Sequence, residues 1–133
     1  MPLEHIRISE QGKEQLIKLK RLTGIQNWNV LCRWAFCLSL AEPTPLVHVR
    51  IPGDSSVEMT WRVFGGHYQE IYLALLKQRC HDDGLDLSDE ILTTQFRLHL
   101  HRGIAHLSAD RRLRNIAELV ARTRPKHSLL SQE

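Results

Sequence analysis

The segment 27–40 constrains the fold most, because its residues are apolar on almost every side of a helix. Three polar side chains interrupt it, namely Asn29, Arg33 and Ser39. A helix without a polar face has to be covered by neighbouring elements, so this segment predicts a central core helix. We expect it to begin near Asn27, a good capping residue, and to end by Ala41, because the residue before Pro43 avoids the α region.

A basic amphipathic segment comes directly before it, between Ser9 and Gly24. Ser9 is a suitable N-cap, because its hydroxyl can accept a backbone N–H that has no partner within the helix. Gly24 fits the left-handed position just past the end of a helix. At 100° per residue, Leu16, Leu19 and Leu22 share one face. The cations spread over the opposite side: Lys13, Lys18, Lys20 and Arg21.

Periodicity predicts the remaining elements. Polar and apolar residues alternate in a short strand at 5–8 and in an extended segment at 57–64, and an ordered loop is expected at 44–56. Helical spacing predicts three more helices, at 67–81, 89–107 and 110–122. The first of these has a wide apolar face, which comprises Tyr68, Ile71, Tyr72, Leu75 and Leu76.

Together these elements predict a mainly α fold. We expect a compact helical domain of four to five helices over residues 1–125, with a short N-terminal strand like the start of ribbon-helix-helix proteins, and a frayed tail at 126–133. No apolar run approaches the ~20 residues that cross a bilayer, and a signal peptide is not evident, so we expect a cytoplasmic protein with no membrane partner. The odd set of cysteines predicts buried free thiols: Cys32, Cys37 and Cys80.

Positive charge gathers toward the two ends of the sequence. Residues 1–42 carry six Lys and Arg against four Asp and Glu, and residues 108–133 carry six against three. Residues 43–107 carry six against eight. The net charge of +3 says little by itself, but this distribution is what a basic binding face would leave. It favours binding to a polyanion over catalysis.

The four cations of the amphipathic helix could neutralise phosphates and give salt-sensitive, largely sequence-independent affinity. The turn at Thr23, Gly24 and Ile25, with the N-terminus of the next helix, could add backbone donors for a phosphate oxygen. Trp28 beside this turn is a candidate for stacking on an unpaired base, or else an anchor for the turn. The alternative for the cations is an ordinary solvated helix face.

The eight histidines do not predict a metal site. They lack the i,i+4 pairs and the Cys/His clusters that zinc prefers. His99 and His106 fall on nearly the same side of a helix as Arg102, whose charge would repel a metal ion. No Ser or Cys occupies a strained glycine elbow of the kind that exposes a nucleophile. We therefore predict no enzyme, no metal and no cofactor.

Three blocks of the sequence are similar to the DndE family of bacterial DNA sulfur modification, or phosphorothioation. They are 9–45, 56–84 and 96–104, and the resemblance covers roughly residues 5–107. It implies a compact, mainly helical homotetramer that binds nicked double-stranded DNA. It also implies that the protein acts together with a cysteine desulfurase and the other subunits of the modification complex, and that it has no active site of its own. The expected DNA contacts lie in the stretch KEQLIKLKR, that is, at Lys13, Lys18, Lys20 and Arg21.

Other hypotheses remain open. The basic face could dock an acidic subunit of the complex, which would make the chain a helical scaffold. A sulfur-transfer enzyme would need an exposed thiol of low pKa. A ribbon-helix-helix start would aim His5 and Arg7 at bases, which ranks below backbone binding because two side chains give little direct readout. The C-terminal arginines form either a second DNA contact or a solvated helix: Arg111, Arg112, Arg114, Arg122 and Arg124.

Overall fold

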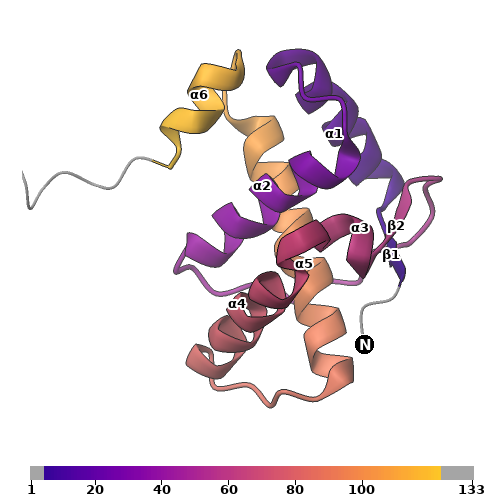
Figure 1. Ribbon diagram of the computed structural model, residues 1–133, viewed down its shortest axis with the longest axis vertical. Helices are drawn as coiled ribbons and strands as arrows, with labels where there is room; N and C mark the ends of the chain where they lie inside the picture. The colour runs from indigo at the N-terminus through magenta and orange to yellow at the C-terminus, as the bar shows by residue number, and fades with distance from the viewer. Residues whose placement is uncertain (1–4, 124–133) are drawn as a thin grey trace, which may run out of the picture.

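The computed structural model describes residues 5–123, and the fold is mainly α. α2 (Trp28–Ala41) lies at the centre, where it crosses α5 (Asp89–Ala109) (Figure 1). The two helices approach so closely that a Cβ at Gly103 would overlap the carbonyl of Ala35. The inner face of α2 is fully buried, so the prediction of a central core helix is confirmed.

α1 (Glu10–Thr23) carries both predicted caps. The Ser9 hydroxyl accepts the N–H of Gly12 at 3.0 Å. Gly24 adopts the left-handed conformation, with φ of 77°, and its N–H donates to the carbonyl of Lys20. The inward side chains of α1 are fully buried, among them Leu16 and Leu19. Because α1 packs against α5 on this side, its other side is presented to solvent.

A two-stranded antiparallel sheet joins the start of the chain to its middle. β1 (His5–Arg7) pairs with β2 (Glu58–Thr60), and Ile6 lies opposite Met59. Both of these central side chains are buried, whereas their neighbours along each strand are exposed. The predicted N-terminal strand is therefore confirmed, and its partner is a strand of the same chain.

The extended segment predicted at 57–64 is confirmed only over β2. A short helix, α3 (Trp61–Gly65), follows it, and the Thr60 hydroxyl caps this helix by accepting the N–H of Val63 at 3.1 Å. Helical spacing brings Trp61 and Phe64 to the same side, where their rings stack at 5.1 Å between centroids. Both rings also pack edge-on against Phe96 of α5. These aromatic contacts favour a helix over the extended conformation that the alternating polar and apolar residues predicted.

The helix predicted at 67–81 forms as a 3₁₀ turn, η1 (Gly66–Tyr68), followed by α4 (Gln69–Asp82). Its predicted apolar face is only partly buried, because α4 covers the core from one side. Leu76 is fully buried, and Tyr72 is partly buried. Three apolar side chains point outward, with exposed fractions of 62%, 55% and 44%: Tyr68, Ile71 and Leu75.

The helix predicted at 110–122 forms only over α6 (Ile116–Ala121). A turn replaces its first part, because the Asp110 carboxylate accepts the N–H of Arg112 at 3.0 Å and pairs with Arg122 at 2.6 Å. Burial alone would raise the pKa of Asp110, but these hydrogen bonds and charges lower it overall. The prediction of one continuous basic helix was therefore wrong. The predicted tail at 126–133, and Arg124, lie outside the described residues.

All three cysteines are free thiols. Cys32 and Cys80 are buried, as predicted, whereas Cys37 is partly buried. Burial raises the pKa of Cys32 to about 12 and also raises the pKa of Cys37 and Cys80. None of the helices in the described part of the chain is both long and apolar enough to cross a membrane.

Candidate nucleic-acid interface

The side chains of the four predicted cations project from α1 in two directions, as two pairs. Lys13 and Lys20 are seven residues apart and share one side of the helix, whereas Lys18 and Arg21 are three apart and share another. The outward face also carries Glu10, Glu14 and Ile17, all of them exposed. The cations are therefore distributed over a mixed surface and do not form an unbroken basic strip.

Two of the lysines hold their side chains in place with neutral acceptors. The Lys13 ammonium donates to the Ser56 hydroxyl at 2.9 Å, just before β2. The Lys18 ammonium donates to the Ser108 carbonyl at 2.6 Å, near the end of α5. Because these acceptors are uncharged, they do not compensate the charge of either lysine, although they fix its stem against a neighbouring segment.

Lys20 contacts an aromatic ring instead. Its ammonium lies 3.5 Å from the centroid of the Trp28 ring, which is half-buried and packs against the core. This is a cation–π contact, typically about 0.5–1 kcal/mol at an exposed site. The ring face that Lys20 covers is not free to stack on a base, so the geometry favours Trp28 as an anchor for the turn.

Arg21 is exposed and has no hydrogen-bond or ion-pair partner within residues 5–123. No carboxylate in this range lies within ion-pair distance of any of the four α1 cations. Several arginines elsewhere do have such partners, for example Arg7 with Glu58 at 2.7 Å. The α1 face therefore carries positive charge that the described part of the molecule does not compensate.

The turn after α1 offers fewer backbone donors than the sequence suggested. The N–H of Gly24 donates to the Lys20 carbonyl, and the N–H of Ile25 donates to the Thr23 hydroxyl at 3.2 Å. Nothing lies within 4 Å of the position where a Cβ would stand on Gly24, so the turn is open to a ligand. Asn27 caps α2 without a side-chain hydrogen bond, which leaves the first N–H groups of α2 as the available donors.

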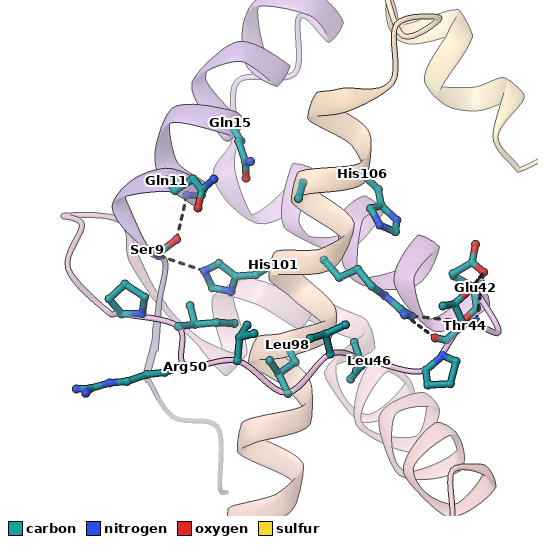
Figure 2. Close-up of a pocket in the computed structure, with 18 of the residues that line it drawn as sticks. Ser9, Gln11, Gln15, Glu42, Thr44, Leu46, Arg50, Leu98, His101 and His106 are labelled. Atoms are coloured by element: carbon teal, nitrogen blue, oxygen red, sulfur yellow. Dashed lines mark hydrogen bonds between the residues drawn. The ribbon is translucent and has the colours of Figure 1, made fainter.

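A cavity of about 660 Å³ lies beside the start of α1 (Figure 2). Its walls are the first turns of α1, the loop between α2 and β2, and the middle of α5. Figure 2 shows that Gln11 and Gln15 approach it from α1 and His101 and His106 from α5. Apolar side chains of the loop cover the remaining wall: Leu46, Val47, Val49 and Ile51.

His101 links α5 to the start of α1. Its Nδ1 donates to the carbonyl of Arg97 at 2.9 Å, and its Nε2 accepts the N–H of Ser9 at 3.1 Å. This pair of bonds requires a neutral ring, because a protonated ring has no nitrogen left to accept. Burial lowers the pKa of His101, which preserves the neutral form. His101 therefore positions the N-terminus of α1.

Arg102 and Arg79 bind the C-terminal end of α2. Arg102 donates to both the hydroxyl and the carbonyl of Ser39, at 2.8 and 2.7 Å, and to the carbonyl of Thr44. Arg79 donates to the carbonyls of Leu40 and Glu42, both at 2.8 Å. These guanidinium groups supply donors to carbonyls in and just after the last turn of α2, where a helix runs out of backbone N–H donors.

His99 also belongs to this cluster. It is fully buried, with Nδ1 at 2.9 Å from the Ser39 hydroxyl. Burial, and then the charges of Arg79 and Arg102, lower its pKa to about 4. His106, by contrast, is exposed. Among residues 5–123, no group of three or more metal-binding side chains lies together.

The family model for the DNA sulphur modification protein DndE matches residues 5–115. The chain belongs to the DndE family. Among solved structures, it is similar to DndE from Escherichia coli B7A, involved in DNA phosphorothioation modification, at 25% identity and a TM-score of 0.67, covering 80% of this chain and 98% of that one. A glycine-to-lysine double mutant of DndE matches at 23% identity and a TM-score of 0.61, covering 78% and 95%. No curated protein sequence matches the chain.

In this DndE-family chain, the other basic residues considered from the sequence have varied surroundings. Glu58 binds both side chains proposed for base contact, since it pairs with Arg7 and lies 3.5 Å from His5. Of the C-terminal arginines, Arg112 and Arg122 pair with Asp110. Arg111 and Arg114 are exposed and have no partner among the described residues.

Sequence reasoning missed the positioning roles of His101, Arg79 and Arg102 in the DndE fold. Their acceptors lie far away along the chain: 92 residues separate Ser9 from His101, and 63 separate Ser39 from Arg102. Periodicity within one helix carries no signal for such contacts. The one signal in the sequence was the residue type, because the guanidinium group of an arginine can bind several carbonyls at once.

Proposed function

We propose that this chain is a non-catalytic DNA-binding subunit of the bacterial DNA phosphorothioation system, and that it prefers nicked double-stranded DNA. Lys13, Lys18, Lys20 and Arg21 of α1 contact backbone phosphates, and the open turn at Gly24 lies beside them. Family membership supports the place in DNA sulfur modification. The observation that carries the DNA contact is the uncompensated charge of these four side chains within the described structure.

Phosphate binding fits the way these cations are held. A lysine paired with a carboxylate must break that pair before it binds a phosphate, whereas a hydroxyl, a carbonyl or a ring face exchanges at lower cost. Lys13, Lys18 and Lys20 have only such neutral partners. Because the buried face of α1 fixes the helix against α5, the cations are also pre-organised relative to the rest of the molecule.

The proposal includes a homotetramer, and α2 and α4 offer a surface for it. Val30, Trp34, Cys37 and Ala41 line a groove of about 630 Å³ on the outer side of α2. Their spacing of four, three and four residues is that of a helix seam that accepts another helix. Tyr72 of α4 also lines this groove, and α4 carries three exposed apolar side chains: Tyr68, Ile71 and Leu75. Light scattering that gives the mass of four chains would support self-association through it.

Fluorescence polarisation tests the DNA contact with nicked, intact and single-stranded DNA of one sequence over a salt series. We expect the tightest binding to the nicked duplex and a steep loss of affinity with salt, because phosphate binding releases counterions. Changing Lys13, Lys18 and Lys20 together to Glu should weaken binding by about 100-fold or more. Lys77→Glu is the matched control, since Lys77 is an exposed lysine of α4.

The result that would overturn the DNA contact is unchanged affinity in the triple variant, with circular dichroism showing it folded. The second candidate function is then a scaffold subunit that docks an acidic partner, which the same uncompensated cations favour. In that case the isolated protein would fail to bind duplexes at moderate salt. It would still be retained by the other modification subunits, and the triple variant would not be.

A further inference from the structure

A smaller pocket of about 450 Å³ lies where the loop before β2 crosses α5. The loop contributes residues 49–53, and α5 contributes Thr94 and Arg97. It is distinct from the α1 cations, none of which lines it. Its charged lining is cationic, with one arginine from each wall.

Arg97 is unusual among the half-buried arginines of residues 5–123. It donates one hydrogen bond, a long one of 3.4 Å to the carbonyl of Arg7, and no carboxylate within residues 5–123 pairs with it. Burial lowers the pKa of Arg97. Three other half-buried arginines each bind at least two oxygen atoms, namely Arg33, Arg79 and Arg102. Arg122 binds one carboxylate oxygen of Asp110 through two of its nitrogens.

Arg50 is the second cation of the pocket. It is exposed and has no hydrogen-bond or ion-pair partner in the described part of the chain. Figure 2 shows its side chain extending away from the larger cavity that it also borders. Two carboxylates of the adjoining chain segment bind other groups, since Asp54 accepts the N–H of Glu10 at 2.8 Å and Glu58 pairs with Arg7.

A partly desolvated guanidinium with one long hydrogen bond and no paired carboxylate among the described residues is unfavourable, so such a group points to a missing anionic partner. We propose that Arg97 and Arg50 bind a phosphoryl oxyanion in this pocket, with the Thr94 hydroxyl as a neutral donor. The planar fork of arginine matches two oxygen atoms of a phosphate, which a single ammonium does not. The source of the oxyanion is either a backbone phosphodiester of DNA or free inorganic phosphate. This site does not depend on DNA contact by α1.

Calorimetric titration with inorganic phosphate, at an ionic strength held constant with chloride, measures the free anion. We expect saturable binding to the wild-type protein and about tenfold or greater loss in Arg97→Gln and in Arg50→Gln, because each removes a charge-assisted donor. Arg97→Lys should bind with intermediate affinity, because it keeps the charge without the fork. The matched control is Arg62→Gln, an exposed arginine of α3, which should bind as the wild type does.

Duplex binding by the same variants separates the two sources. If the oxyanion belongs to DNA, Arg97→Gln weakens duplex binding several-fold relative to the Arg62→Gln control. If it is free phosphate, duplex binding matches the control while phosphate binding is lost. The triple glutamate variant of α1 should retain phosphate binding, so failure of the α1 contact is distinguishable. Folded Arg97→Gln protein that equals wild type toward both ligands would overturn the proposal.

Discussion

Two groups of cations look alike in the sequence and differ in their surroundings. Arg79 and Arg102 converge on the C-terminal end of α2, where each binds several oxygen atoms. The cations of α1 have at most one neutral partner each. Both groups lie on helices and carry the same charge. The number of acceptors already bound, and not the charge, separates cations that hold the fold from cations that remain available to a ligand.

Stability measurements should show the largest contrast between the two groups. Arg102→Gln removes charged donors to the hydroxyl and the carbonyl of Ser39 and to the carbonyl of Thr44, next to the partly buried end of α2. We expect a loss of about 3 kcal/mol in the free energy of unfolding, measured by urea denaturation. Lys13→Gln removes one exposed hydrogen bond to a hydroxyl, so its effect should stay within about 0.5 kcal/mol. Equal losses in the two variants would contradict the distinction between the groups.

The features of the fold that depend on residues close together in the sequence could be predicted from it. Both caps of α1 and the core position of α2 follow from local residue types and from helical period. α3 could not be predicted, because the cap at Thr60 and the aromatic contacts of Trp61 overrule an alternating pattern. The shortening of the last helix likewise depends on Arg122, which pairs with a carboxylate 12 residues earlier.

For the candidate site too, contacts between residues far apart in the sequence could not be predicted. The positions of the four cations and of Gly24 follow from the period of α1, and the structure confirms the helix and its left-handed end. Their partners do not follow, because Ser56 and Ser108 lie 43 and 90 residues away from the lysines they bind. The counts of charge along the sequence also gave no hint of Arg97, which lies in a segment where acidic residues outnumber basic ones.

Burial of His99, together with the nearby charges of Arg79 and Arg102, also makes stability depend on pH. The unfolded chain takes up a proton on this histidine near pH 6.5, whereas the folded protein does so only near pH 4. Between these values the unfolded state binds more protons, so the free energy of unfolding falls as the pH falls from 6.5 toward 4. His99 alone should account for about 2 kcal/mol at pH 5 and about 3 kcal/mol at pH 4.

Urea denaturation at pH 7, 6 and 5 measures this effect, and His99→Gln is the comparison. The variant should be less stable at pH 7 and should lose less stability between pH 7 and pH 5. His101, whose pKa burial also lowers, contributes in the same direction and leaves a residual slope in the variant. An equal slope in wild type and variant would mean that His99 is not the titrating group.

The smallest predicted change is at Lys20, which both stabilises the fold through Trp28 and is proposed to contact a phosphate. Lys20→Met keeps an apolar stem beside Trp28 but removes the charge, so the loss of stability should be about 0.5–1 kcal/mol. The same change should reduce the slope of log affinity against log salt for duplex DNA by about 0.9, the value for one phosphate contact. Lys77→Met, on α4, should change neither quantity. A reduced stability with an unchanged salt slope would assign Lys20 to the turn alone, and the α1 contact would then consist of Lys13, Lys18 and Arg21.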